Sequence, residues 1–255
     1  MARQLLTLPA GDRDLRRLLA ITGVFIALSV FFVAYPAVDL AFSRLFYDGG
    51  FYMASKRWTK FLHTSVSWFV YGSLLAIGAA YAFNRLKRRN LWGMDGRKAV
   101  YLLLVLGLGA GLVVNEVFKD QFGRARPKDI VEFGGTAQFT PPYVVSSNCS
   151  HNCSFSCGDG AAAFFALAFA KGARRRRLVV AAAVVYGTIV SAARIVSGSH
   201  FLSDAIVSFF VMLILTEGLY YLMYRPARDS GKSTAAPPVG PETTIANSGV
   251  PLQRQ

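Results

Sequence analysis

The chain has 255 residues, of which 53% are hydrophobic and only 16% are charged. An ordinary soluble domain carries about 25% charged residues, and the apolar residues here gather into long runs. This composition excludes a typical water-soluble domain and indicates a membrane protein. The formal net charge of +14 comes from basic blocks beside alternate apolar runs, a distribution that argues against nucleic acid as a partner.

Six apolar runs are long enough, or nearly so, to cross a membrane as helices, which takes about 20 residues each. The sequence therefore predicts an all-α fold, a polytopic bundle of six transmembrane helices. The fourth run is short, and it spans only if Phe155 and Lys171 extend it. The runs are Leu18–Val38, Phe61–Phe83, Val100–Phe118, Gly158–Ala170, Leu178–Ile195 and Ala205–Tyr224.

One membrane domain is predicted over residues 18–224, after an N-terminal cytoplasmic segment at 1–17. Residues 225–255 are rich in Pro, Ser, Thr and Gly, a composition typical of a disordered tail. The first apolar run exceeds the 7–15 residues of a signal-peptide core, which favours an uncleaved helix.

Basic residues set the expected orientation. They lie before the first run, after the second and between the fourth and fifth: Arg13, Arg16 and Arg17; Arg85, Lys87, Arg88 and Arg89; Lys171 and Arg174 to Arg177. The positive-inside rule then places both termini in the cytoplasm. The basic blocks also suit anionic membrane lipids as a secondary partner.

The outward segments have two notable features. Residues 39–60 mix aromatic and basic side chains, which indicates either an interfacial amphipathic stretch or an aromatic belt. The loop over residues 120–155 is longer than most and ends near three cysteines, Cys149, Cys153 and Cys157. One pair could form a disulfide in an oxidising compartment. Zinc held with His151 is the rival interpretation, although the spacing is not that of a familiar zinc site.

Two polar segments, each at the outer end of an apolar run, carry the residues of a phosphate site. The first contains Lys119 and Arg126, and the second contains Arg194, His200 and Asp204. A phosphate monoester carries nearly two negative charges, and arginine forks and a lysine point charge suit its oxygens. The same cations would stabilise charge that develops during phosphoryl transfer.

His200 is the candidate nucleophile of this site. One ring nitrogen of a histidine can attack phosphorus while the other donates to a carboxylate that fixes its orientation. Asp204 lies four residues on, one helical turn away. The competing interpretation is a structural histidine near a helix end, and the nearby Arg194 argues for the catalytic one. Glu116 is expected to pair with Lys119 at i,i+3 spacing.

These segments resemble two motifs of the type 2 phosphatidic acid phosphatase superfamily. The first family motif is Lys, six residues, Arg-Pro, which Lys119–Pro127 matches in full. The third is Ser-Arg, five residues, His, three residues, Asp. Arg194, His200 and Asp204 match it, with Ala193 in place of the serine. The resemblance covers about residues 18–224.

The resemblance implies a metal-independent lipid phosphatase without a cofactor. His200 would form a phosphohistidine and Asp204 would orient it. The phosphate-binding residues would be Lys119, Arg126 and Arg194.

The second family motif, Pro-Ser-Gly-His, is altered. The aligned residues are Ser156, Cys157, Gly158 and Asp159. Cys157 is a weaker donor to phosphate than serine. Asp159 replaces the general acid, yet an ordinary aspartate is ionised at neutral pH. The stretch is similar to a bacterial branch that resembles lipid A 4′-phosphatases, and whether Asp159 is the acid or a substrate contact stays open.

The sequence thus predicts a bacterial inner-membrane lipid phosphatase whose site faces the periplasm. Its expected partner is a phosphorylated lipid, with lipid A favoured over undecaprenyl pyrophosphate and phosphatidylglycerophosphate. Two alternatives remain: a phosphotransferase that uses the same phosphohistidine, and a catalytically weak lipid-phosphate-binding protein. The sequence leaves the oligomeric state open.

Overall fold

The computed structural model describes residues 10–224, and within this range the chain is helical apart from loops and two isolated bridges. The predicted tail over residues 225–255 lies outside the described residues. The α-helices are α1 (Ala10–Ala34), α2 (Ala37–Arg44), α3 (Arg57–Lys87), α4 (Gly96–Leu104), α5 (Asp120–Phe122), α6 (Gly158–Phe164), α7 (Arg176–Val196) and α8 (Leu202–Tyr224). The π-helical and 3₁₀ segments are η2 (Leu91–Gly93), η3 (Val105–Lys119), η4 (Pro127–Asp129), η5 (Val131–Phe133) and η6 (Phe165–Ala170).

Five helical stretches of the described residues are long and apolar enough to cross a membrane, which confirms the all-helical membrane fold. A sixth helix, Gly158–Ala170, is shorter. The extension of this helix by Phe155 and Lys171 is wrong. Phe155 lies in the preceding loop, and the backbone of Lys171 is already extended. The long third stretch joins α4 to α5 through wide π-helical turns, where the Asn115 side chain donates to the Ala110 carbonyl oxygen at 2.7 Å.

The short α6–η6 segment lies at the centre of the bundle. It contacts α3, α7, α8 and η3, whereas α1 packs mainly on α8. Phe164, Phe165 and Met212 belong to the buried core around it. Close packing depends on Gly187, since a Cβ there would lie 2.2 Å from the Phe164 ring. The short helix is therefore held by its neighbours on several sides.

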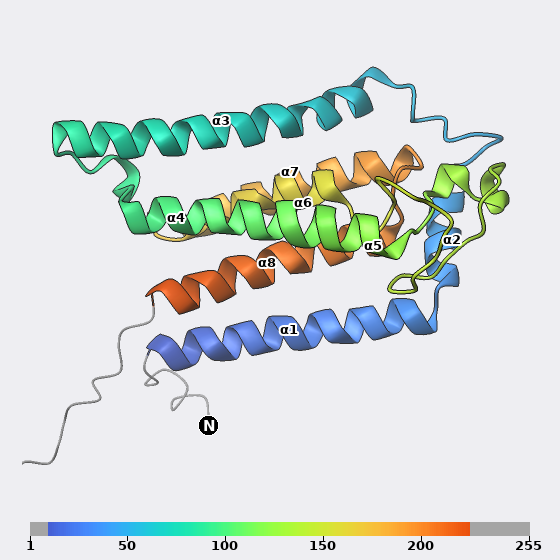
Figure 1. Ribbon diagram of the computed structural model, residues 1–255, viewed down its shortest axis with the longest axis horizontal. Helices are drawn as coiled ribbons and strands as arrows, with labels where there is room; N and C mark the ends of the chain where they lie inside the picture. The colour runs from blue at the N-terminus through green and yellow to red at the C-terminus, as the bar shows by residue number, and fades with distance from the viewer. Residues whose placement is uncertain (1–9, 225–255) are drawn as a thin grey trace, which may run out of the picture. The chain divides into compact units, whose positions relative to one another are not determined.

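The bundle has two distinct ends (Figure 1). The start of α1, the end of α3, the start of α4 and the end of α8 form one, which we call the basic end. The other, the site end, carries α2, α5 and the turn before α8. At the basic end the buried Glu217 carboxylate forms ion pairs with Nζ of Lys171 at 2.5 Å, Nη2 of Arg17 at 3.2 Å and Nη2 of Arg176 at 3.8 Å. Some of the basic residues from which the orientation is predicted therefore also pair with this buried carboxylate.

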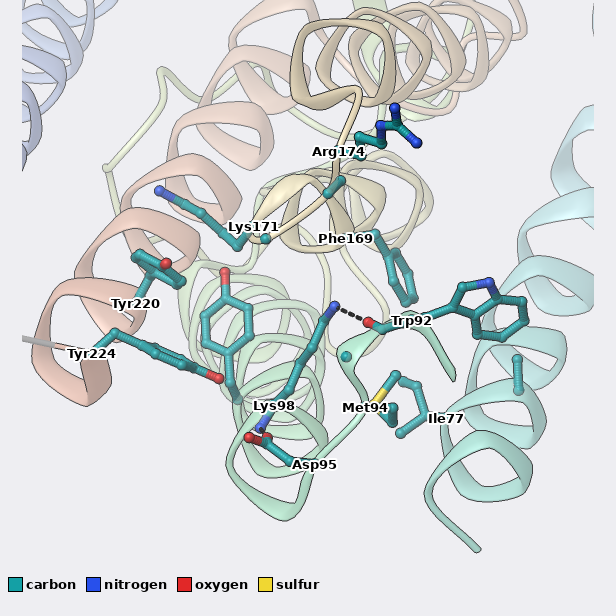
Figure 2. Close-up of a pocket in the computed structure, with 15 residues that line it drawn as sticks. Ile77, Trp92, Met94, Asp95, Lys98, Phe169, Lys171, Arg174, Tyr220 and Tyr224 are labelled. Carbon is teal, nitrogen blue, oxygen red and sulfur yellow. Dashed lines mark hydrogen bonds between the residues drawn. The ribbon is translucent and has the colours of Figure 1, made fainter. Parts of the chain in front are cut away.

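A cavity of about 670 Å³ opens at the basic end. Figure 2 shows its lining of aromatic and basic side chains, including Trp92, Lys98, Lys171 and Tyr224. Two of its cations already have partners, since Lys98 donates to the Trp92 carbonyl oxygen at 2.8 Å and Lys171 pairs with Glu217. None of the predicted site residues lines this cavity, so its size does not mark it as the reaction site.

Candidate active site

The predicted motifs meet at the site end. Lys119 ends η3, and Arg126 lies in the loop before η4. Asp159 is in the first turn of α6, Arg194 is in the last turn of α7, and Asp204 is in the first turn of α8. His200 lies in the turn between α7 and α8, and Gly198 adopts the positive φ of 68° that this turn requires. Residues from four separate segments of the chain are thus brought to one end of the bundle.

His200 is fully buried, and a backbone carbonyl of the long loop holds its ring. Its Nδ1 donates to the Ser154 carbonyl oxygen at 2.8 Å, whereas Oδ2 of Asp204 lies 3.6 Å from the same nitrogen. The bond to Ser154 fixes the tautomer that keeps Nε2 free of a proton when the ring is neutral. Burial opposes charging of the ring, but the influence of Cys157 and of the Asp204 carboxylate outweighs it and raises the pKa of His200 to about 9.

Asp204 supports the site in a different way from the direct bond that the sequence suggested. Its Oδ2 accepts from the Ser154 hydroxyl at 2.5 Å and from the Phe201 N–H at 2.8 Å. Its Oδ1 accepts from Nη1 of Arg124 at 2.6 Å. The carboxylate therefore holds the segment whose carbonyl orients His200, and its negative charge acts on the ring at longer range.

Arg124 is the centre of a buried network that sequence reasoning missed. Its side chain is 1% exposed, and its Cζ lies 4.1 Å from the centroid of the Phe201 ring, over the face of that ring. Its guanidinium donates to Asp204 and, through Nη2, to Oδ2 of Asp39 in α2 at 2.8 Å. Asp39 in turn accepts from the Ser203 N–H at 2.9 Å. One arginine thus joins α2, the long loop and the start of α8, next to the segment that holds His200.

The long loop returns to the two cations of the first motif. Lys119 Nζ donates to Oδ1 of Asn152 at 3.0 Å, and Nη2 of Arg126 donates to the Asn152 carbonyl oxygen at 2.8 Å. A disulfide between Cys149 and Cys153 closes this part of the loop. Of the three possible cysteine pairs that the sequence left open, Cys149–Cys153 is the one that forms. The expected pairing of Glu116 with Lys119 is replaced by the contact with Asn152.

The altered second motif lies at the start of α6. Cys157 is the N-cap residue, and its sulfur accepts from the Gly160 N–H at 3.4 Å. Gly158 lies close against the lysine, since a Cβ there would be 3.1 Å from Lys119 Nζ. Asp159 Oδ2 lies 2.9 Å from Nε of Arg194, although Nε is not aligned for a hydrogen bond. The aspartate is therefore paired with Arg194, a cation of the third motif.

A second histidine, His63, contacts Asp159. Nδ1 of His63, from the second turn of α3, lies 3.0 Å from the same Oδ2 of Asp159. Sequence reasoning missed His63. The available signal was an ionisable residue within an apolar run, which is a functional candidate by default. His151, by contrast, is 85% exposed, and its nearest acidic partner is Asp120 at 3.7 Å.

A zinc site at the cysteines has no support in the structure. Among residues 10–224, no group of three or more His, Cys, Asp or Glu side chains is placed to hold a metal ion. The reason is local: two of the three cysteines are joined to each other, and Cys157 is buried at the α6 cap.

Comparison with known families agrees with this geometry. The PAP2 superfamily profile matches residues 99–228, which include all three motifs. The chain belongs to the PAP2 superfamily. The family predicted from the first and third motifs is thereby confirmed, and with it the enzyme class, a phosphatase.

Individual relatives of this PAP2 protein are also informative. It is 36% identical to the lipid A 4′-phosphatase of Francisella tularensis subsp. novicida (strain U112), over 77% of this chain and 90% of that one. A lipid A 4′-phosphatase of Rhizobium etli is 29% identical, over 75% and 84% of the two chains. The PAP2-type phosphatidylglycerolphosphate phosphatase of Bacillus subtilis has a similar fold, with a TM-score of 0.56 and 20% identity over 83% of this chain and 98% of that one.

Proposed function

We propose that this PAP2 protein is a bacterial inner-membrane phosphatase that removes a phosphate from a lipid A-type substrate at the periplasmic face. The observation that carries the proposal is the buried His200 ring, anchored through Nδ1 at the end of the bundle where the motif cations gather. That arrangement leaves Nε2 to attack phosphorus. The cations Lys119, Arg126 and Arg194 supply the charge that a phosphate needs.

The reaction has two steps in this proposal. In the first, Nε2 of His200 attacks phosphorus, the bond to the lipid oxygen breaks, and a phosphohistidine forms. In the second, water attacks the phosphohistidine, the N–P bond breaks, and inorganic phosphate leaves. Asp204 acts as a positioning residue, because it holds Ser154 and so the ring.

A groove at the site end suits a lipid substrate. It has a volume of about 430 Å³ and is lined by apolar residues of α1, α2, α7 and α8, among them Phe42, Ile195 and Phe209. Ile195 follows Arg194 directly. An acyl chain in the groove would therefore place its headgroup beside a phosphate-binding cation. Lipid A is the preferred substrate because the relatives of highest identity reported above carry that activity in their names.

The proposed location follows from charge. The basic blocks lie at the basic end, so the positive-inside rule directs that end to the cytoplasm and the site end to the periplasm. The Cys149–Cys153 disulfide at the site end suits an oxidising compartment.

Phosphate release by the purified full-length protein in detergent tests the proposal. Lipid A, undecaprenyl pyrophosphate and phosphatidylglycerophosphate serve as substrates, with His200→Ala as the matched variant. We expect release from lipid A that is lost in His200→Ala and unchanged by EDTA, since the proposed steps use side chains alone. Full activity of His200→Ala would rule out the phosphohistidine.

The same assay separates the two remaining alternatives. The altered second motif, with Cys157 and Asp159, is the feature that favours a weakly catalytic binding protein, which would bind lipid A without releasing phosphate. A phosphotransferase would instead yield a phosphorylated acceptor lipid in place of free phosphate.

A further inference from the structure

The altered second motif leaves the proposed reaction without an obvious proton donor. A sugar or glycerol oxygen leaves poorly as an alkoxide, so the first step needs a general acid. The family pattern places a histidine at the position of Asp159. The structure places an imidazole in contact with that position, but from another helix: Nδ1 of His63 in α3 lies 3.0 Å from Asp159 Oδ2.

We propose that His63 is the general acid of this site, held by Asp159. The inference rests on the proposed function, since it assigns a role within the same reaction. Asp159 is then a positioning residue, not the proton donor that the motif alignment suggested. A carboxylate that accepts from Nδ1 fixes the ring and its tautomer, and leaves Nε2 to work on the substrate.

The contacts of Asp159 favour this division of roles. Its Oδ2 lies within 3.0 Å of two nitrogen atoms, Nδ1 of His63 and Nε of Arg194. An oxygen that faces an imidazole and a guanidinium serves as an acceptor, not as a proton donor. The same contacts place His63 beside Arg194, a cation expected on the phosphate. The imidazole is therefore next to the atoms that react.

Exposure also distinguishes the two site histidines. The His63 side chain is 54% exposed, whereas that of His200 is 2% exposed. A proton donor must reach the leaving oxygen of an incoming lipid and then exchange its proton with water. The exposed His63 can do both. The buried His200 is shielded from water, which suits a nucleophile whose partner is the phosphorus atom of a bound substrate.

The proton balance of both steps is complete. As Nε2 of His200 forms its bond to phosphorus, the P–O bond breaks and its electron pair stays on the leaving oxygen. The imidazolium of His63 gives its Nε2 proton to that oxygen and becomes neutral. In the second step neutral His63 takes a proton from the attacking water, the N–P bond breaks, and the starting protonation state returns.

The competing explanation is that His63 and Asp159 merely clamp α3 to α6. The two roles differ in how they depend on the leaving group. A general acid matters for an alkyl phosphate and hardly at all for p-nitrophenyl phosphate, whose nitrophenolate leaves without a proton. A clamp affects both substrates alike, because it acts through the shape of the site.

The test compares these two esters in the purified full-length protein. For His63→Gln we expect turnover of dioctanoyl phosphatidic acid to fall by about 10²- to 10⁴-fold, and turnover of p-nitrophenyl phosphate to change by less than about threefold. Equal losses on both esters, or no loss on phosphatidic acid, would overturn the proposal.

Two matched variants complete the design. His151→Gln removes the remaining, highly exposed histidine at this end, and both rates should stay at the wild-type level. A selective loss of phosphatidic acid turnover in His151→Gln would overturn the assignment to His63. His200→Ala should lose turnover of both substrates. Lipid A hydrolysis by the wild type tests the proposed substrate separately. If the wild type does not hydrolyse lipid A but His63→Gln still loses only phosphatidic acid turnover, the role of His63 stands and the proposed substrate is wrong.

Discussion

His200, the proposed nucleophile, has a raised pKa of about 9. Burial opposes charging of its ring, and Cys157 and Asp204 favour it. In the proposed reaction the ring attacks phosphorus only when it is neutral. Because the folded-state pKa exceeds the ordinary value of 6.5, the proton on His200 stabilises the fold. That contribution is complete below about pH 6.5 and is lost as pH rises through about 9. Reactivity and stability therefore respond to pH in opposite directions at this residue.

We predict that kcat/KM for p-nitrophenyl phosphate, whose leaving group needs no proton from His63, rises about tenfold per pH unit below about 9 and then levels off. In Cys157→Ser the rise should shift to lower pH, because the substitution removes the sulfur of Cys157, the largest influence that raises the pKa of His200. Serine is also a good N-cap for α6. Initial rates from pH 5 to 10 for the two proteins provide the check.

An identical pH profile in both proteins would show that Cys157 does not act on His200. Thermal unfolding of each protein at pH 7 is the control, since a less stable variant would lose activity at all pH values without a shift of the rise.

At the level of residues, spacing along the chain predicted which side chains gather at the site and not how they bond. Lys119, Arg126, Arg194 and Asp204 lie at helix ends or in adjacent loops, where a motif can be recognised. The role of His63 depends on a contact across 96 positions of sequence. No local pattern encodes such a contact, because it arises from the packing of α3 against α6.

Arg124 shows the same limit between elements. Its position in the sequence singles it out as no site residue, yet it is 1% exposed and binds carboxylates of α2 and α8. Its partners lie 80 and 85 positions away, so only the folded structure reveals them. The helices themselves were predictable from apolar runs. The short fourth helix also keeps the bounds of its apolar run, Gly158–Ala170, and buried neighbours surround it on several sides.

We predict that Arg124→Met destabilises the protein by about 3–5 kcal/mol, since two buried carboxylates lose their cation. Activity should fall as well, because Asp204 would no longer hold Ser154 in place. Denaturant unfolding in detergent measures the loss. Lys128→Met, at an exposed position four residues away, is the control and should change stability by less than about 0.5 kcal/mol. Equal stability of the two variants would contradict the role of Arg124.

The groove between α1, α2, α7 and α8 yields a prediction at the same scale. Ala192 lines it from α7, so Ala192→Trp should displace part of a bound acyl chain. Loss of contact with two methylene groups raises KM for lipid A by roughly tenfold, while KM for p-nitrophenyl phosphate stays the same.

The control for the groove is Ala181→Trp, which changes an exposed position of the same helix outside the groove. It should leave both KM values unchanged. A similar increase in KM for both substrates in Ala192→Trp would mean that the substitution distorts the site itself and does not act through the groove.

For the molecule as a whole, the separation of charge along the bundle determines the orientation that the proposed function requires. α3 has 31 residues and extends about 46 Å at 1.5 Å per residue, more than the hydrocarbon core of about 30 Å. Its two ends must therefore lie on opposite sides of the membrane. Arg85, Lys87 and Arg88 lie at one end, and the three sequence motifs lie at the other.

Labelling of new cysteines at the two ends of α3 tests this orientation in cells. In a Cys157→Ser background, where Cys149 and Cys153 remain joined, Ser55→Cys should react with a membrane-impermeant thiol reagent in intact spheroplasts. Arg89→Cys should react only after permeabilisation. Both positions are exposed, so burial does not explain a difference. The reverse pattern would place the site on the cytoplasmic face, where a lipid of the outer leaflet could not reach His200.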